Sequence, residues 1–439
     1  MATSLVTQRA EAQRSGLSLV RDAEIEALVR EYSNPLMKAA GLRPGSVQIS
    51  LVNDSSFNAF VSGRGMFIHT GLLLQAEDPN EVIGVIAHEL GHVVGGHQIR
   101  MRERIETASR IAQWTSLLGL GLGAAAAVAG EGDAAAAGFG LAASSGGFAL
   151  RDILKYQREE ESAADRTAIK LLKSTKQSGK GMLETFKRLA RNTSIVSGRI
   201  DPYLQSHPTP NQRLSSLRSE VQASPYFGKK SSAALKQRHD MVRAKIAAYT
   251  GNTRYSSAVL SDKNLHPDAK LYGRAILAYL YGSPKRALPL IDSLLKKYPT
   301  QPYINEMKGE ILLRSARAKD AIAPFRRAVK YDKTGAGFLR VELGHALLES
   351  GSQKHLDEAI VQLRKGLTRD QTAVMGYQYL AQAYGRKGQT NRALLATAEY
   401  SMRIGRVAQA KQYAKRAQQG FKRGTPSWLR AEDIINYRR

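Results

Sequence analysis

The chain has 439 residues, of which 43% are hydrophobic and 23% are charged. This length exceeds one compact domain, so two or three domains are expected, and the apolar content excludes a mostly disordered protein. Cysteine is absent, which excludes a disulfide scaffold, a cysteine nucleophile and a thiolate metal site. A metal ion in this protein must therefore be held by His, Asp and Glu side chains.

The formal net charge of +27 is distributed unevenly along the chain. Residues 1–220 hold 25 Lys and Arg against 22 Asp and Glu, whereas residues 221–439 hold 40 against 16, so the net charges are +3 and +24. The second part is expected to attract acidic proteins or anionic lipid head groups. Nucleic-acid binding ranks last among the functions considered, because the sequence contains no recognition motif for it.

The first 80 residues favour a small α+β arrangement. Residues 1–16 have no apolar signal-peptide core and are expected to be flexible. A helical pattern follows from Leu17 to Ala40. The short segments VQISLV, FNAFVS and GMFIHT are rich in β-branched and aromatic residues, so we expect a small antiparallel sheet. An exposed edge at FNAFVS can pair with an extended substrate.

The strongest chemical signal is HELGH at residues 88–92, in a long helix that begins at Pro79. His88 and His92 are four residues apart, so both imidazoles project from one helix face and can share one ion. Glu89 lies beside this face, near the metal but not on it. The alternative is a solvated helix with two surface histidines, but the apolar run VIGVIA just upstream argues against it. His97 falls off the ligand face and is not expected in the site.

Two uncharged stretches rich in Ala and Gly lie within residues 111–150. By length, the first could cross a membrane, but Ala and Gly contribute little transfer energy. We therefore expect a helical hairpin that packs on the domain or lies at a membrane interface, rather than a membrane span.

The acidic segment YQREEESAADRTAIKLL follows this hairpin. Glu161 and Asp165 share one helix face, next to two alanines that permit close helix packing. Glu161 can supply the third protein ligand that a catalytic zinc needs, and Asp165 can hydrogen-bond a ligand histidine. Spacing alone barely separates Glu161 from Glu160 or Glu159, and a solvated acidic face is the alternative.

The remainder of the chain is predicted to be a repeat domain. A charged helical linker at residues 223–265 precedes residues 266–439, in which Gly309, Ala321 and Phe325 have the spacing of a tetratricopeptide repeat. The recurring positions in the other units are Ala275, Ala287, Ile291 and Pro299, then Gly344, Ala359 and Leu363 after a three-residue insertion, then Ala381, Gly388 and Ala393. A last unit, Ala398 to Ala417, shares a helix with its predecessor. Stacked helix pairs of this kind form an α-solenoid.

A set of motifs in fixed order resembles a known family. HELGH, the uncharged hairpin, E-x-x-A-D at residues 161–165 and His207-Pro208 followed by Arg213 look like the HtpX-type zinc metalloproteases, family forty-eight of the metallopeptidases. With its repeats, the chain is most similar to the beta-barrel assembly-enhancing subgroup of the bacterial envelope. The resemblance implies a gluzincin fold with one Zn²⁺ per chain.

The resemblance also implies roles for individual residues. The zinc ligands are His88, His92 and Glu161, the catalytic residues are Glu89 and His207, and the supporting residues are Asp165 and Arg213. His207 is expected either as a fourth ligand that keeps the enzyme latent or as a donor to the transition-state oxyanion. Arg213 is a second candidate for the oxyanion donor.

Together these features predict a mainly α protein, with a zinc metalloprotease domain at residues 17–222 followed by the solenoid. The predicted function is zinc-dependent endopeptidase action on misfolded or partner proteins in envelope quality control. The basic repeats are expected to recruit substrates or outer-membrane assembly machinery, with possible peripheral membrane contact. The alternative function is a chaperone or scaffold whose protease domain is latent or inert. The resemblance implies the periplasm, and because the chain shows no export signal, a cytoplasmic or membrane-peripheral location is the alternative.

Overall fold

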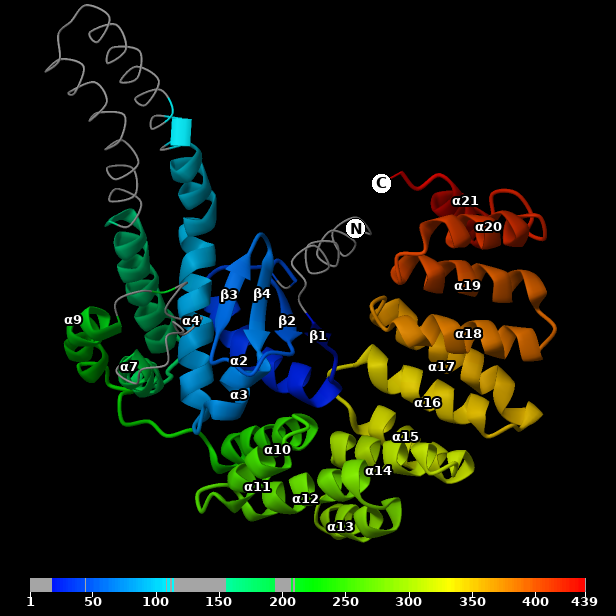
Figure 1. The fold of residues 1–439 in the computed structure, drawn as a ribbon, viewed down its shortest axis with the longest axis horizontal. Helices are drawn as coiled ribbons and strands as arrows, with labels where there is room; N and C mark the ends of the chain where they lie inside the picture. Colours follow the sequence, from blue (N-terminus) through cyan, green and yellow to red (C-terminus); the bar gives the residue numbers. More distant parts are fainter. Residues whose placement is uncertain are drawn as a thin grey trace, which may run out of the picture. The chain divides into compact units, whose positions relative to one another are not determined.

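The computed structural model describes residues 18–43, 45–107, 109–110, 113, 155–193, 207 and 210–438 (Figure 1). Its two compact units comprise, first, the described residues up to Arg21 with Leu28–Arg243 and, second, Asp22–Ala27 with Ala244–Arg439. The predicted flexible N-terminus and, apart from Gln113, the predicted hairpin at 111–150 lie outside the described residues. Among the helices that are described, none combines the length and the apolar character needed to cross a membrane.

The first unit contains a four-stranded sheet in the order β1-β2-β4-β3. The strands are β1 (Leu19–Val20), β2 (Gln48–Val52), β3 (Ala59–Ser62) and β4 (Gly65–His69). β1 with β2 and β3 with β4 are antiparallel pairs, but β2 and β4 are parallel. The prediction of an antiparallel sheet was therefore wrong for the central pair. A tight turn at Gly63 (φ 57°) joins β3 to β4. β3 lies at the outer edge of the sheet, and β4 lies between β3 and β2.

Helix α2 (Ala23–Ala39) begins later than the predicted Leu17. Leu19 pairs with Val52 in the sheet, so the chain is extended before the helix begins. The Asp22 side chain then accepts a hydrogen bond from the backbone N–H of Ile25 (2.9 Å), which satisfies one of the donors left open at a helix start.

Helix α4 (Pro79–Gly95) carries the HELGH motif and is buried along most of its length. It begins with a capping box between Asp78 and Glu81 and ends at Gly96, whose φ of 65° is left-handed. A Cβ on Gly91 would lie 2.6 Å from the carbonyl oxygen of Ala164, so only glycine allows the helix at 155–174 to approach this closely. This close contact aligns the acidic segment with the HELGH face.

The first unit contains further helices beside α4 and the sheet (Figure 1). They are α3 (Thr70–Gln75), the helical residues 97–107 and 155–174, α7 (Lys180–Thr193), α9 (Pro210–Gln222) and α10 (Ala233–Tyr249), of which the last continues into the second unit. The linker predicted at residues 223–265 contains α10 and α11 (Thr253–Ser261), and the division between the units falls at Ala244, inside α10.

The second unit consists of stacked helix pairs (Figure 1). They are α12 (Pro267–Tyr281) with α13 (Pro284–Lys297), α14 (Pro302–Arg314) with α15 (Ala318–Tyr331), α16 (Gly337–Glu349) with α17 (Leu356–Arg369), α18 (Val374–Arg386) with α19 (Thr390–Arg403), and α20 (Val407–Gln418) with α21 (Pro426–Ile435). Helix α19 also packs on α20, as the prediction of a shared helix requires.

The repeat pattern read from the sequence matches the packing within these pairs. A Cβ on Gly309 would lie 2.8 Å from the Phe325 ring, and one on Gly344 would lie 2.5 Å from Leu363, so both glycines permit close helix approach. The predicted three-residue insertion corresponds to a short 3₁₀ helix, η1 (Gln353–His355), between α16 and α17. The α-solenoid of the predicted fold class is therefore confirmed.

Candidate metal centre and active site

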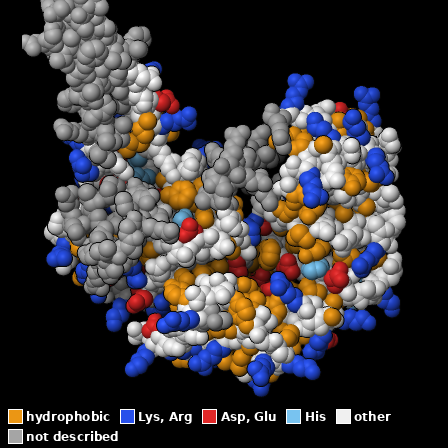
Figure 2. Space-filling view, in the orientation of Figure 1, with side chains coloured by type: hydrophobic (Ala, Val, Ile, Leu, Met, Phe, Trp, Pro, Cys, Tyr) orange, Lys and Arg blue, Asp and Glu red, His pale blue; other side chains and the backbone are white. Residues whose placement is uncertain are grey.

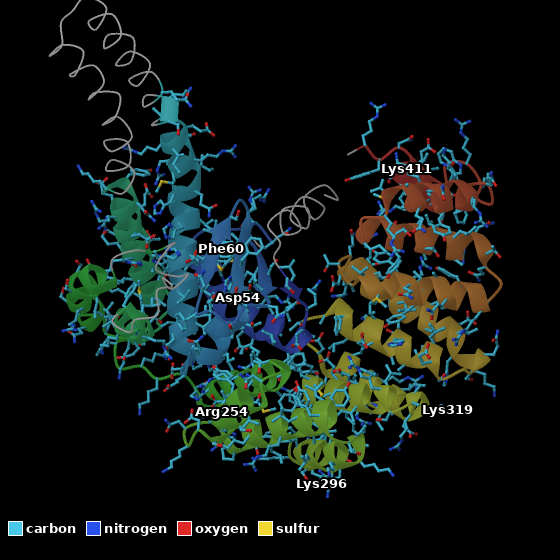
Figure 3. The ribbon with its side chains drawn as sticks, in the orientation of Figure 1. Asp54, Phe60, Arg254, Lys296, Lys319 and Lys411 are labelled. Atoms are coloured by element: carbon cyan, nitrogen blue, oxygen red, sulfur yellow. The ribbon has the colours of Figure 1, made fainter. Side chains whose placement is uncertain are left out.

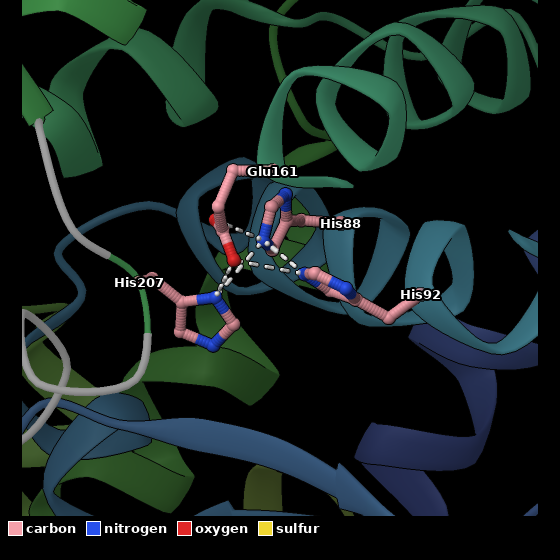
Figure 4. A group of neighbouring side chains, drawn as sticks. All are labelled: His88, His92, Glu161 and His207. Atoms are coloured by element: carbon pink, nitrogen blue, oxygen red, sulfur yellow. Dashed lines mark hydrogen bonds and ion pairs between the residues drawn. The ribbon is translucent and has the colours of Figure 1, made fainter. Parts of the chain in front are cut away.

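Four side chains from three parts of the first unit converge at one point (Figure 4). His88 and His92 come from α4, Glu161 comes from the helix at 155–174, and His207 lies shortly before α9. One donor atom from each lies within 4.8 Å of the others, and all four side chains are buried. We call these four residues the ligand group.

The geometry of the ligand group suits a single ion. The Nε2 atoms of His88 and His92 are 3.0 Å apart, and each lies 3.4 Å from an oxygen of Glu161. The Nδ1 atom of His207 lies 2.9 Å from Glu161 and 3.3 Å from His88. Nitrogen and carboxylate donors aimed at a common centre are the set that zinc prefers when thiolates are absent.

Behind the ligand group, Asp165 and Arg213 hold His88 and Glu161 in place. Asp165 Oδ1 lies 2.9 Å from His88 Nδ1, the ring nitrogen that faces away from the other ligands. The Arg213 guanidinium donates two hydrogen bonds to Asp165, at 2.7 and 2.8 Å, and lies 2.8 Å from Glu161. A carboxylate behind a ligand histidine fixes its tautomer and its orientation.

Glu89 lies next to the ligand group but outside it. Its side chain is fully buried, and neither carboxylate oxygen accepts a hydrogen bond from the described residues. His207 Nε2 is 3.3 Å from Glu89 Oε1, so this carboxylate faces the side on which His207 enters. Burial raises the pKa of Glu89, but the nearby charge of His207 outweighs it and lowers the pKa, so the carboxylate is ionised and available to take up a proton from a reactant.

Charge dominates the chemistry of this site. Burial raises the pKa of Glu161, but the nearby charge of His207 and hydrogen bonds from the ligand histidines outweigh it and bring the pKa well below 4.5. Burial lowers the pKa of His207, whereas Glu161 and Glu89 raise it, with a net result of about 10. Opposite charge on the neighbours thus outweighs desolvation at both residues.

The charges at the site match one divalent cation. Glu89, Glu161 and Asp165 are buried carboxylates, and Arg213 is the cation that pairs with two of them. Metal binding uses the lone pairs of the imidazoles and so displaces the proton of His207, after which the three carboxylates and Arg213 leave a balance of −2. Buried charge must be compensated locally, and a divalent ion between the four donors would supply the missing +2.

A cleft of about 530 Å³ opens onto the ligand group. Its apolar lining includes Phe60 and Val61 from the edge strand and Met101 and Ile105 from the helical residues 97–107. Phe60 lies on β3, the strand that borders α4 (Figure 3). A peptide chain can therefore reach the buried donors between a strand edge and a helix.

Residues 20–221 match the peptidase family M48. The chain is 24% identical to the "Beta-barrel assembly-enhancing protease" of Yersinia pestis, over 90% of this chain and 80% of that protein. The protein of the same name from Escherichia coli (strain K12) is also 24% identical, with coverage of 90% and 79%. "Metalloprotease YcaL" of the same strain is 29% identical over 44% of this chain and 70% of its own length.

The chain is a metalloprotease whose residues 20–221 match peptidase family M48. Zinc is the metal of this family, and the ligand group is the set of donors that fits it. Among solved structures, that of MamA is 18% identical and covers 37% of this chain and 90% of its own, with a TM-score of 0.29.

The M48 domain brings together every site residue that the sequence predicted, namely His88, Glu89, His92, Glu161, Asp165, His207 and Arg213. Glu159, which spacing could not separate from Glu161, is exposed. Arg213 is already engaged by Asp165 and Glu161, which favours its supporting role over that of oxyanion donor.

His97, which the sequence left out of the site, is not in the ligand group but lies directly behind one of its members. Its Nδ1 is 2.9 Å from Nδ1 of His92, although a continuous helix would point it elsewhere. The helix is interrupted at Gly96, whose left-handed backbone redirects the residues that follow. The Gly95-Gly96 pair was the signal in the sequence that could have indicated this change of direction.

Proposed function

We propose that this metalloprotease is a zinc-dependent endopeptidase that cleaves unfolded or misassembled proteins. The observation that carries the proposal is the buried ligand group, with the ionised carboxylate of Glu89 beside it and a peptide-sized cleft in front. A zinc ion held there supplies a Lewis acid that polarises a carbonyl oxygen and makes water more acidic.

The residues of the chain divide the remaining chemistry among them. Glu89 accepts the proton of the attacking water at a carboxylate oxygen and later delivers it to the departing amine. Asp165 keeps the Nε2 lone pair of His88 directed at the metal by holding its Nδ1 proton. His207 lies within reach of both Glu89 and Glu161, where it can close the fourth corner of the site or donate to the oxyanion.

The edge strand β3 is suited to holding an extended substrate. The Gln98 side chain donates to the carbonyl oxygen of Val61 and accepts a hydrogen bond from the N–H of Gly63 (3.0 Å). A carboxamide has the same donor and acceptor groups as a peptide bond, so the outer edge of β3 already pairs with a peptide-like group. This arrangement supports binding of the substrate by strand addition, which selects for extended and therefore unfolded chains.

The repeat unit supports a role in recruiting proteins. In α13, α15, α17 and α19, the second helices of four pairs, 13 Lys and Arg outnumber 5 Asp and Glu, whereas in α12, α14, α16 and α18 the numbers are 6 and 5. Basic side chains are spread over the repeat unit in Figure 2, and Lys296 and Lys319 are exposed (Figure 3). Such a surface favours acidic protein partners.

The names of the relatives extend the proposal to a cellular setting. Two of them are beta-barrel assembly-enhancing proteases that align with 90% of this chain, repeats included. We therefore propose that this protein acts in the periplasm on proteins of outer-membrane assembly, and that its repeat unit binds the substrates or their assembly machinery.

The decisive experiment replaces Glu89 with Gln, which keeps the shape of the side chain and removes its ability to take up a proton. Glu89→Gln should bind one zinc per chain and digest unfolded casein about 10²–10⁴-fold more slowly than wild type, the range typical of loss of a general base. Glu103→Gln, at an exposed glutamate of the helical residues 97–107, is the matched control and should cleave normally. Undiminished digestion by purified Glu89→Gln would refute the proposal.

The second candidate function is a tetratricopeptide scaffold whose protease domain is latent. The position of His207 within the ligand group favours it, because a fourth protein donor excludes water from the metal. If the domain is latent, His207→Ala should digest casein faster than wild type. If His207 instead donates to the oxyanion, the same variant should digest casein more slowly.

A further inference from the structure

His97 and Glu160 form a buried pair directly behind His92, on the side away from the other ligands. His97 Nδ1 is 2.9 Å from His92 Nδ1, and His97 Nε2 is 2.6 Å from Glu160 Oε2. Both residues are buried, with 5% of His97 and 8% of Glu160 exposed. The three residues thus form one hydrogen-bonded chain that ends on a carboxylate.

Glu160 is itself fixed from behind. Arg100 Nη2 donates to both of its oxygens at 3.0 Å, and Arg100 Nε donates to the Tyr156 hydroxyl at 3.0 Å. The carboxylate therefore has a defined position, and His97 is held between two residues that cannot rotate freely.

The backbone is shaped to admit His97 at this position. Gly96 ends α4 in a left-handed conformation, and the next helical residues start in a new direction. A Cβ on Gly95 would lie 2.0 Å from His97 Nε2, so any other residue at 95 would displace the ring. Two consecutive glycines are thus needed, one for the turn and one for the space that the imidazole fills.

The proton arrangement follows from the geometry. His92 Nε2 faces the ligand group, so a metal held there would use its lone pair and leave the His92 proton on Nδ1. His97 Nδ1 then accepts that proton's hydrogen bond, and the His97 proton on Nε2 is donated to Glu160. One arrangement of protons satisfies every donor and acceptor in the chain.

We propose that His97 and Glu160 are positioning residues that fix the tautomer and the orientation of His92 for zinc binding. They do for His92, through an intervening imidazole, what Asp165 does directly for His88. The proposal rests on the proposed function, since it takes His92 as a zinc ligand.

Zinc affinity provides the test, measured on the full-length chain by competition with a chromophoric chelator. His97→Ala should bind zinc about 10–100-fold more weakly than wild type, as is typical when the partner of a ligand histidine is lost. His97→Gln should recover part of this loss, because its amide oxygen can accept the hydrogen bond from His92. Glu160→Gln should weaken binding less than His97→Ala, and Glu159→Gln, on the exposed face of the same helix, is the control and should match wild type.

The visible absorption of the cobalt-substituted protein gives a second readout that does not depend on cleavage. The spectrum should change in His97→Ala and Glu160→Gln but not in Glu159→Gln. Wild-type zinc affinity together with an unchanged cobalt spectrum in His97→Ala would overturn the proposal. If His97→Ala does not fold, as judged by circular dichroism, Glu160→Gln decides, and its unchanged affinity and spectrum would overturn the proposal equally. Failure of the wild type to bind zinc would instead defeat the proposed function itself.

Discussion

Two buried ionic clusters, one in each unit, handle an excess of carboxylates in different ways. The first is the metal centre, where Glu161 and Asp165 pair with one guanidinium and Glu89 lies beside the ligand histidines. The second, which we call the Lys245 cluster, consists of Asp22, Glu24, Lys245, Tyr272 and Glu306. Lys245 Nζ lies 2.7 Å from Asp22 and 3.2 Å from Glu24, and the Tyr272 hydroxyl donates to Glu24 at 3.0 Å.

The pKa shifts of the two clusters have opposite signs. In the Lys245 cluster, burial raises the pKa of Glu24 and raises that of Glu306 further, despite the attraction of Lys245. In the metal centre, burial also raises the pKa of Glu161 and Asp165, but histidine and arginine neighbours outweigh it and lower both. Carboxylates of the first kind are easier to protonate than usual, whereas those of the second kind stay ionised to lower pH and demand a cation.

The difference shows what distinguishes a metal site from a structural ion cluster. An imidazole can bind a metal ion through a nitrogen lone pair. Of the two clusters, only the metal centre contains imidazoles among the described residues. The Lys245 ammonium offers only donors at neutral pH, and the Tyr272 hydroxyl donates its proton to Glu24, so neither side chain is a ligand that zinc prefers. Carboxylate number alone therefore does not identify a metal site.

The largest effect is expected from Glu161→Ala, which removes the carboxylate that faces all three histidines of the ligand group. Zinc affinity should fall more than about 100-fold, because removing a ligand weakens zinc binding more than removing a residue that only hydrogen-bonds a ligand. Metal analysis after dialysis measures the loss. Glu159→Ala, the exposed neighbour, should retain one zinc per chain. Full zinc content in Glu161→Ala would show that this carboxylate is not needed to hold the metal, and the contrast between the two clusters would then fail.

The next largest effect is expected from Lys245→Met in the second cluster. Removing the ammonium leaves Asp22 and Glu24 without their cation, so the free energy of unfolding should fall by about 3 kcal/mol. Urea unfolding followed by circular dichroism measures this, and zinc content should not change. Lys319→Met removes an exposed lysine instead (Figure 3) and should alter stability by less than about 0.5 kcal/mol.

Much of this architecture follows from local sequence patterns, and its failures have physical causes. Helical spacing places His88 and His92 on one face, and small residues mark where repeat helices approach. Spacing could not separate Glu161 from Glu160, because both side chains are buried and only contacts with a distant part of the chain decide which of them faces the histidine pair. The contact between Gly91 and Ala164 decides it.

Two further features lie beyond any local pattern. His207 precedes a proline in a polar segment, and nothing near it in the sequence places it beside Glu161, 46 residues earlier. His97 was excluded because helical periodicity assumes a continuous helix, and one left-handed residue at Gly96 invalidates that assumption. Both cases depend on tertiary contacts or on a single backbone angle.

The smallest expected effect concerns Glu306, whose Oε2 is buried and accepts no hydrogen bond from the described residues. Because burial raises its folded pKa above 4.5, the native state binds this proton more tightly than the unfolded state does. The stabilising contribution is therefore fully present below about pH 4.5 and is lost as the pH rises through the folded pKa. Glu306→Gln replaces the carboxyl group with an amide that does not ionise, so this loss of stability at high pH does not occur. The substitution should raise the free energy of unfolding by about 1 kcal/mol at about pH 8.

The same substitution should have little effect at about pH 5, where the native carboxyl is already protonated, so the gain itself must depend on pH. Urea unfolding at the two pH values measures it, with Glu349→Gln as the exposed control that should give no pH-dependent gain. An equal gain at both pH values would mean that shape rather than charge limits this position. In that case, proton uptake would not be how the Lys245 cluster tolerates its carboxylates, and its contrast with the metal centre would rest on the lysine alone.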